Sequence, residues 1–144
     1  FAGTEARGAY FVVSGRLNYT QEPESSLVTE LNNTEVIADT WICEAALWCE
    51  WIHVGSLSSL EQSELLVVDA DKLFESLRGH HMILGIAIEY CRSFHERVIT
   101  SRPPRKAWPT DLKVPFTEFE DIALSMSPEV RRIMGYDAIG HLIP

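Results

Sequence analysis

Residues 41–77 constrain the fold more than any other part of the chain, because several structural signals follow one another closely there. An apolar entry ends at the acidic residue Glu44, and residues 45–48 (Ala-Ala-Leu-Trp) favour a short helix. Residues 52–57 then have the composition of an extended strand, and an apolar run at 65–68 returns after a polar turn. This order predicts a helical turn beneath a β-hairpin.

The same stretch ends with the signals of a longer helix. Asp69 is a typical N-cap residue, and Leu73, Phe74 and Leu77 follow it at helical spacing. Gly79 is placed to end the helix. We therefore expect a helix between Asp69 and Gly79.

In order and spacing, this stretch resembles the phosphate-binding cassette of cyclic-nucleotide-binding domains. That family has an aromatic-Gly-Glu-x-Ala-Leu sequence, an Arg nine positions after the Glu, and a strand ending in Asp before the next helix. The corresponding positions here are occupied, without a gap, by Ile42, Cys43, Glu44, Ala46, Leu47, His53 and Asp69. Residues 8–17, an apolar strand interrupted by Gly15, look like the family's preceding hairpin, so the resemblance covers roughly residues 3 to 98.

The resemblance implies a fold that is mainly β with C-terminal helices (α+β), an antiparallel β-roll or jelly-roll of the cyclic-nucleotide-binding type. We expect this roll and its C-terminal helix in residues 1–100, and a linker with a helical tail in residues 101–144. The family has a helix and two strands before the first strand seen here. The N-terminal strands are therefore expected to be missing, and the chain to start inside a domain of a longer protein.

The resemblance also implies a ligand, cAMP or cGMP, and the residues that would contact it. These are Cys43, Glu44, Ala45, Ala46, His53 and Val54. In the family, the Glu accepts a hydrogen bond from the ribose 2′-hydroxyl, and the Arg grips the cyclic phosphate with a permanently charged fork. His53 replaces that Arg, and losing a charge-assisted contact of ~1.5–3 kcal/mol would weaken binding about tenfold to a hundredfold.

Two further departures bear on ligand binding. Cys43 replaces a glycine, which matters if the position needs a positive φ or close approach to a ligand. Trp41, Trp48 and Trp51 either pack in the core or fill space that a nucleotide would need, and we expect core packing for at least two of them. Two hypotheses stay open: a nucleotide-binding domain, and a homology domain whose pocket is filled by its own side chains or by the tail.

The rest of the chain has simpler patterns. The strand at residues 10–14 is apolar on both faces and is expected to be buried, while residues 20–33 are expected to form a polar surface loop and 35–39 a short strand. From 80 to 98 the pattern is helical, and 102–106 form a stiff Pro-rich linker. The helical stripe consists of Ile83, Ala87, Tyr90, Phe94 and Val98.

The tail has two helix signals. Thr117 and Glu120 match a capping box, and Ser127 followed by proline predicts a second helix that stops at Gly135. Three aromatic residues of the tail are too apolar to remain loose in water, so we expect the tail to dock, on a surface that the sequence does not indicate. They are Trp108, Phe116 and Phe119.

Composition excludes several functions. A formal charge of −9 argues against nucleic-acid binding. The pairs His80–His81 and Cys91–His95 lack further ligands, so we expect no bound metal or cofactor. No phosphate loop or nucleophile elbow is present in the sequence, so we do not expect the chain to be an enzyme.

Cys43, Cys49 and Cys91 form no disulfide framework, which favours a reducing interior. The longest apolar run, 82–88, is too short for a membrane helix.

We interpret the chain as a regulatory segment of a larger intracellular or membrane-attached protein, in the cytoplasm or at the cytosolic face of a membrane. A gating segment of a cation channel is favoured, and a cAMP- or cGMP-binding kinase regulatory subunit is the alternative. An acidic protein-interaction module without a nucleotide is the third hypothesis. The expected partner is the remainder of the parent protein, through which the segment would also oligomerise. The nucleotide, the parent, the role of the tail and the oligomeric state stay open.

Overall fold

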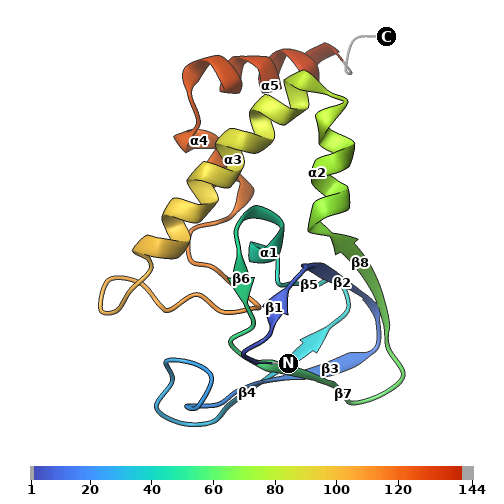
Figure 1. The fold of residues 1–144 in the computed structure, drawn as a ribbon, viewed down its shortest axis with the longest axis vertical. Helices are drawn as coiled ribbons and strands as arrows, with labels where there is room; N and C mark the ends of the chain where they lie inside the picture. The colour runs from blue at the N-terminus through green and yellow to red at the C-terminus, as the bar shows by residue number, and fades with distance from the viewer. Residues whose placement is uncertain (1, 141–144) are drawn as a thin grey trace.

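The structure, a computed structural model, describes residues 2–140 and has antiparallel sheets at one end and helices at the other (Figure 1). Its strands are β1 (Glu5–Ala6), β2 (Gly8–Ser14), β3 (Arg16–Gln21), β4 (Asn32–Ile37), β5 (Trp41–Ile42), β6 (Trp51–Ile52), β7 (Ser56–Ser59) and β8 (Glu64–Asp69). Its helices are α1 (Ala45–Trp48), α2 (Ala70–Arg78), α3 (His81–Thr100), α4 (Phe119–Ser125) and α5 (Pro128–Gly140). The expected α+β class is confirmed.

The strands form two three-stranded sheets, β5-β2-β8 and β4-β3-β7, and the pair β1-β6. The chain passes from the first sheet to the second at Gly15, whose φ is +93° and where a side chain would collide with Ser63. The expected hairpin of residues 52–68 is wrong, because β7 pairs with β3 whereas β8 pairs with β2. The turn between β7 and β8 therefore connects two sheets instead of two paired strands.

The strand β2 is buried on both faces only at its start, where Gly8 and Ala9 are buried, so the prediction that it is buried on both faces is wrong for its later part. Val12 is fully buried, whereas Val13 is 45% exposed. Phe11 is half-buried and packs against Trp41, with ring centroids 5.1 Å apart, and Leu66 lies opposite Phe11 on β8 and is also exposed. The outer face of this sheet is apolar but uncovered within the described residues.

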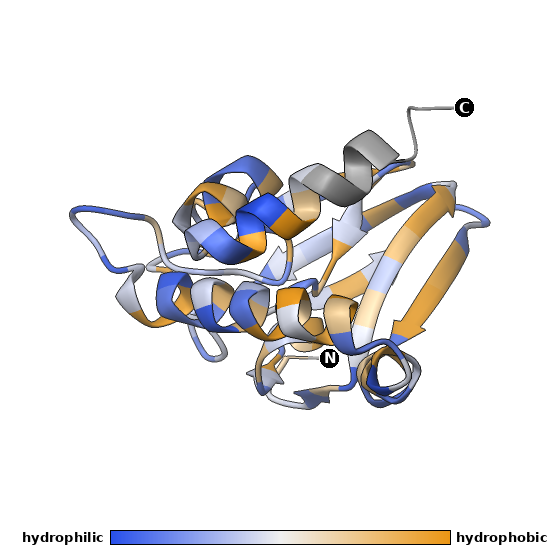
Figure 2. Ribbon diagram, turned by 90° about the horizontal axis from the view of Figure 1, so that it is seen from above, coloured by the Kyte–Doolittle hydropathy of each residue, from blue (hydrophilic) through white to orange (hydrophobic). Residues whose placement is uncertain are grey.

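The core includes residues of the sheets, the helices and the tail. Figure 2 shows apolar and polar residues alternating along the helices. Val12 of β2, Phe94 of α3 and Ile122 of α4 are among the most completely buried side chains of the core. Trp51 is buried, and Trp48 packs against the same cluster. The expectation that at least two tryptophans are core residues is therefore confirmed.

The helices after β8 follow the sequence pattern closely. The Asp69 carboxylate accepts the N–H of Lys72 at 3.0 Å, and Gly79 follows the last residue of α2, as expected. In the longer helix α3, Ala87 and Phe94 are buried, and only the first residue of the apolar stripe, Ile83, is exposed. A short loop joins the two helices, which diverge from it like the arms of a V (Figure 1).

The tail helices differ from expectation at their ends. The capping box is wrong, because the Thr117 hydroxyl donates to the Val114 carbonyl and α4 begins after Glu118 without a side-chain cap. The cap at Ser127 is confirmed, since its hydroxyl accepts the N–H of Val130 at 3.3 Å. The predicted stop at Gly135 is wrong, because α5 continues to Gly140.

The carboxylate of Glu89 on α3 holds the start of α5. It accepts the backbone N–H and the hydroxyl of Ser127, each at 2.8 Å. These two hydrogen bonds stabilise the charged form and keep the pKa of Glu89 below its usual range. A carboxylate on one helix thus caps the next, which fixes the angle between them.

The tail docks, as expected. Trp108, Phe116 and Phe119 are 39%, 56% and 57% exposed, so they are not the buried contacts that hold the tail. The buried tail residues are Asp111, Val114, Ile122 and Met126.

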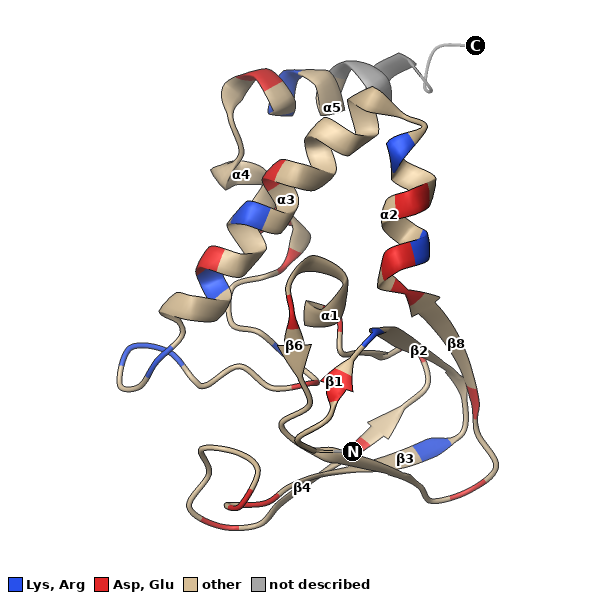
Figure 3. Cartoon of the chain, viewed as in Figure 1, with Lys and Arg blue, Asp and Glu red and all other residues tan. Residues whose placement is uncertain are grey.

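The cationic residues of the linker at 102–106 lie on a projecting loop, and acidic residues are spread over the helices and loops (Figure 3). Within residues 2–140, no helix combines the length and apolar character needed to cross a membrane.

Candidate functional site

The carboxylate of Asp111, a tail residue, is buried at the centre of the molecule and is the most densely bonded polar group there. It is 3% exposed. Six donors converge on its two oxygens. Oδ1 faces Trp51 Nε1 (2.7 Å), His53 Nδ1 (3.1 Å) and Cys43 Sγ (3.4 Å), and Oδ2 faces Tyr19 Oη (2.7 Å), Gly55 N (2.9 Å) and Val54 N (3.0 Å).

The sheets build this arrangement, which we call the Asp111 cradle. Tyr19 comes from β3 and Trp51 from β6, and the two backbone donors lie in the turn between β6 and β7. The turn passes so close to β3 that a side chain on Gly55 would collide with the ring of Tyr19. Glycine at this position therefore lets the backbone N–H approach the carboxylate.

The tail presents Asp111 on a tight turn. The N–H of Thr110 donates to the Lys113 carbonyl at 2.9 Å, and the N–H of Lys113 donates to the Thr110 hydroxyl at 3.0 Å. The Asp111 carbonyl also accepts the N–H of Cys43 at 2.6 Å. Backbone and side chain of Asp111 thus both bind the segment that resembles the cassette.

Cys43 has a φ of +59°, the left-handed conformation that favours glycine. This fits the glycine that the family has at this position. Burial, followed by the charge of Asp111, raises the pKa of the Cys43 thiol, and burial likewise raises the pKa of Tyr19. A protonated thiol is a poor nucleophile.

The contacts of His53 also argue against a proton relay. Both the Cys43 thiol and the Asp111 carboxylate face the same ring nitrogen, Nδ1. A nucleophile–base–acid triad uses the two different nitrogens of the imidazole. The arrangement therefore differs from such a triad.

Glu44 faces a different hollow from His53. Its carboxylate lines a cavity of about 430 Å³ between α1 and the tail, and it accepts the Trp48 indole N–H at 3.4 Å. Burial raises the pKa of Glu44. His53 lines a cavity of about 150 Å³ with Tyr19 and Cys43. Glu44 and His53, which the resemblance implies would contact one ligand, thus line different cavities, and Asp111 borders both.

The structure thus brings together only part of the residue set implied by the resemblance. Cys43, His53 and Val54 meet at Asp111, whereas Ala45 and Ala46 are buried in α1 and Glu44 lies apart. Whether these residues contact a nucleotide stays a prediction.

Asp111 itself was missed by the sequence analysis. Its only local signal is the neighbouring turn residue Thr110, and nothing in the tail sequence indicates what the turn binds.

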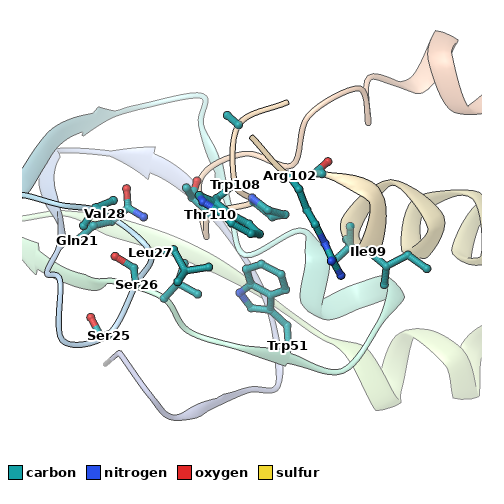
Figure 4. A pocket seen from close by; sticks show the side chains of 15 residues that line it. Gln21, Ser25, Ser26, Leu27, Val28, Trp51, Ile99, Arg102, Trp108 and Thr110 are labelled. Atoms are coloured by element: carbon teal, nitrogen blue, oxygen red, sulfur yellow. The ribbon is translucent and has the colours of Figure 1, made fainter. Parts of the chain in front are cut away.

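A larger hollow lies on the other side of Trp51 (Figure 4). Its volume is about 500 Å³, in the range of small-molecule pockets. Its walls are largely apolar and come from the loop before β4, the end of α3 and the linker. They include Leu27, Val28, Trp51, Ile99 and Trp108, with Arg102 as the cation. Since the Trp51 indole also donates to Asp111, this side chain connects the hollow to the cradle.

The weaker candidate pairs stay apart from this centre. His80, His81 and His95 are exposed, and Cys91 is half-buried, with a pKa raised by burial. Burial also raises the pKa of Cys49 to about 11. These thiols therefore lack the environment that activates a cysteine.

No family model matches the chain, and no curated protein matches it. Its fold is similar to several solved structures, among them the following two. One is a cyclic nucleotide-binding-like protein from Brucella abortus bv. 1 str. 9-941, at 18% identity and a TM-score of 0.46, with 54% of this chain and 66% of that chain covered. The other is a transcriptional regulator of the CRP family from Thermus thermophilus, at 15% identity and a TM-score of 0.39, with 71% and 51% covered. At these identities the likeness concerns the fold alone.

Proposed function

We propose that this chain is a regulatory domain of the cyclic-nucleotide-binding type whose anion position is filled by its own carboxylate, Asp111. The observation that carries the proposal is the convergence of six donors on that carboxylate. One donor, His53, stands at the position of the family's phosphate-binding Arg. Another contact, from Cys43, stands at the family's glycine and has the matching positive φ.

The size of the neighbouring cavity supports a competition between Asp111 and a free ligand. The cavity beside His53 measures about 150 Å³, whereas small-molecule pockets have roughly 300–1,000 Å³. A cyclic nucleotide could reach His53 only after Asp111 had left. A tethered group also acts at an effective concentration on the order of millimolar, so a free nucleotide starts at a disadvantage.

Displacement of Asp111 would act on the tail. The segment that carries it continues into α4 and α5, which pack on α3 through Ile122 and through the cap of Ser127 on Glu89. A ligand that prefers the open cradle would shift the tail away from the sheets, and this differential preference is what a switch requires. We favour a cation channel as the parent protein, with this chain as its gating segment, and a kinase regulatory subunit as the alternative. The partner would be the remainder of the parent protein.

The proposal is tested by titrating labelled cAMP and cGMP into the wild type, Asp111→Ala and Glu120→Ala at pH 6 and pH 7.5. Glu120 is an exposed carboxylate on the same tail and is the matched control. We expect the wild type and Glu120→Ala to show no saturation below about 1 mM, and Asp111→Ala to bind at least about tenfold more tightly. Adding His53→Arg to Asp111→Ala should strengthen binding a further tenfold to a hundredfold or so.

Two outcomes contradict the proposal. Saturable micromolar binding by the wild type would mean that Asp111 does not compete. An Asp111→Ala protein that stays folded by circular dichroism and gains no affinity would leave the acidic, nucleotide-free interaction module as the better function. The net charge of −9 favours that second candidate.

A further inference from the structure

The Asp111 cradle brings together three side chains that can bind a metal: a thiol, an imidazole and a carboxylate. Cys43 Sγ lies 3.2 Å from His53 Nδ1 and 3.4 Å from Asp111 Oδ1, and the latter two atoms are 3.1 Å apart. Cys43 and Asp111 are buried, and His53 is half-buried. The three ligand atoms form a nearly equilateral triangle.

Two protons hold this triangle together when no metal is bound. With a proton on Nδ1, both Nδ1 and the Cys43 thiol can donate to Asp111 Oδ1, and the 3.2 Å contact between Sγ and Nδ1 carries no hydrogen bond. A single cation would take the place of both protons and bond all three atoms.

The dimensions of the triangle suit zinc. Zinc binds sulfur at about 2.3 Å, nitrogen at about 2.0–2.1 Å and carboxylate oxygen at about 2.0–2.2 Å, so a tetrahedral site places its ligand atoms roughly 3.4–3.6 Å apart. The separations of 3.1, 3.2 and 3.4 Å are shorter by only a few tenths of an ångström. Thiolate together with imidazole selects zinc over magnesium or calcium, which prefer oxygen ligands.

The surroundings complete such a site. The indole of Trp51 donates to the oxygen that would bind the metal, and Tyr19 and the N–H of Gly55 hold the other oxygen. Hydrogen bonds of this kind orient a ligating carboxylate. The cavity of about 150 Å³ borders all three ligands and has room for water at a fourth position.

We propose that Cys43 Sγ, His53 Nδ1 and Asp111 Oδ1 form a zinc-binding site, with water from the cavity as the fourth ligand. On binding, the thiol releases its proton to solvent and the thiolate bonds the metal, while the imidazole takes the neutral tautomer protonated at Nε2, which frees the Nδ1 lone pair for the metal. The ion would join the tail residue Asp111 to two residues of the sheet end, and so hold the tail in its docked position. This inference goes beyond the proposed function, since it requires no nucleotide.

The test uses Co²⁺ as a spectroscopic probe of the whole chain, in the Cys49→Ser/Cys91→Ser protein, where Cys43 is the only remaining thiol. We expect one equivalent of Co²⁺ to give a thiolate-to-cobalt charge-transfer band and intense tetrahedral d–d bands, and Zn²⁺ to remove them by displacement. Adding Cys43→Ser should abolish the charge-transfer band and weaken Zn²⁺ binding at least tenfold. Adding His53→Gln should weaken it similarly.

Absence of the charge-transfer band in the folded Cys49→Ser/Cys91→Ser protein would overturn the zinc site, and so would unchanged Zn²⁺ affinity after Cys43→Ser. Zn²⁺ should also raise the thermal midpoint of the wild type and leave that of Cys43→Ser unchanged. Failure of the zinc-binding test can be distinguished from failure of the proposed function. Nucleotide competition is measured separately, with Asp111→Ala in a metal-free buffer containing a chelator.

Discussion

Asp111 and Glu44 are two carboxylates in neighbouring parts of the molecule, yet their surroundings differ sharply. Six donors surround Asp111, and it is almost completely buried. Glu44 has the indole of Trp48 at 3.4 Å and the phenol of Tyr90, and it stays half-exposed at the edge of a wider hollow. Tyr90 is affected in turn, since burial and then the charge of Glu44 raise its pKa.

The difference lies mainly in where the partners come from. Glu44 bonds Trp48, four positions away within its own helical turn, and Tyr90 of α3. Asp111 bonds Tyr19 and Trp51, which are 92 and 60 positions away. The acid that a local motif singles out is therefore not the acid that the fold surrounds with donors. Long-range contacts decide which of the two carboxylates is the more densely bonded.

The largest expected effect comes from removing the Asp111 carboxylate. Asp111→Ala leaves several buried donors without an acceptor, among them the indole of Trp51 and the hydroxyl of Tyr19. We expect the free energy of unfolding to fall by about 3–5 kcal/mol, as when one partner of a buried polar pair is lost. Urea denaturation monitored by tryptophan fluorescence measures this change.

The matched control is Glu120→Ala, which removes an exposed carboxylate from the same tail and should change stability by less than about 0.5 kcal/mol. Equal losses for the two variants would mean that Asp111 has no special role in stability.

A smaller loss is expected when the backbone is kept from approaching the cradle. In Gly55→Ala, the new methyl group would collide with the ring of Tyr19, so either the turn or the ring must shift. We expect a loss of about 1–3 kcal/mol, as for other overpacked sites, measured by the same urea titration.

Gly85→Ala provides a control of opposite sign. Gly85 lies in α3 with nothing within 4 Å of the added methyl group, so alanine should stabilise the helix by about 0.5–1 kcal/mol. A stabilising Gly55→Ala would show that the close approach to Tyr19 is unnecessary.

The smallest effect is expected at Glu44, and it depends on pH. Burial raises the pKa of Glu44 in the folded protein, so the folded state holds a proton that the unfolded state has lost between the two pKa values. This contribution to stability is present below the unfolded pKa and disappears as the pH rises through the folded pKa. Since Glu44 is only half-buried, Glu44→Gln should raise stability near pH 7 by less than about 1 kcal/mol, and should have little effect near pH 4.

Unfolding curves of the wild type and Glu44→Gln across pH 4–7 measure this difference. A loss of stability near pH 7 on substitution would mean that the ionised carboxylate makes a favourable contact there, as Asp111 does.

Local sequence signals predicted local structure well. The helical turn after Glu44 and the cap at Asp69 depend on a few consecutive residues, and both are present. The pairing of β7 and β8 with different strands was not predictable in the same way, because the turn between them has the composition of any hairpin turn. Gly135 failed as a stop because a glycine lowers helix stability without ending the helix.

The candidate site was only half predictable for the same reason. His53 and Cys43 follow from the register of the motif, but their partner Asp111 lies in a polar, Pro-rich tail with no periodic pattern. Its burial depends on donors contributed by β3, β6 and the turn after β6. No local feature of the tail encodes that set of donors.

The most direct test of the cradle is hydrogen exchange at the indole N–H of Trp51, followed by NMR and assigned with Trp51→Phe. If this group donates to the buried carboxylate of Asp111, it should exchange at a rate close to that of global unfolding, whereas the indole of exposed Trp108 should exchange quickly. Exchange at Trp51 as rapid as at Trp108 would contradict the account, because Asp111 would not then be held in the cradle.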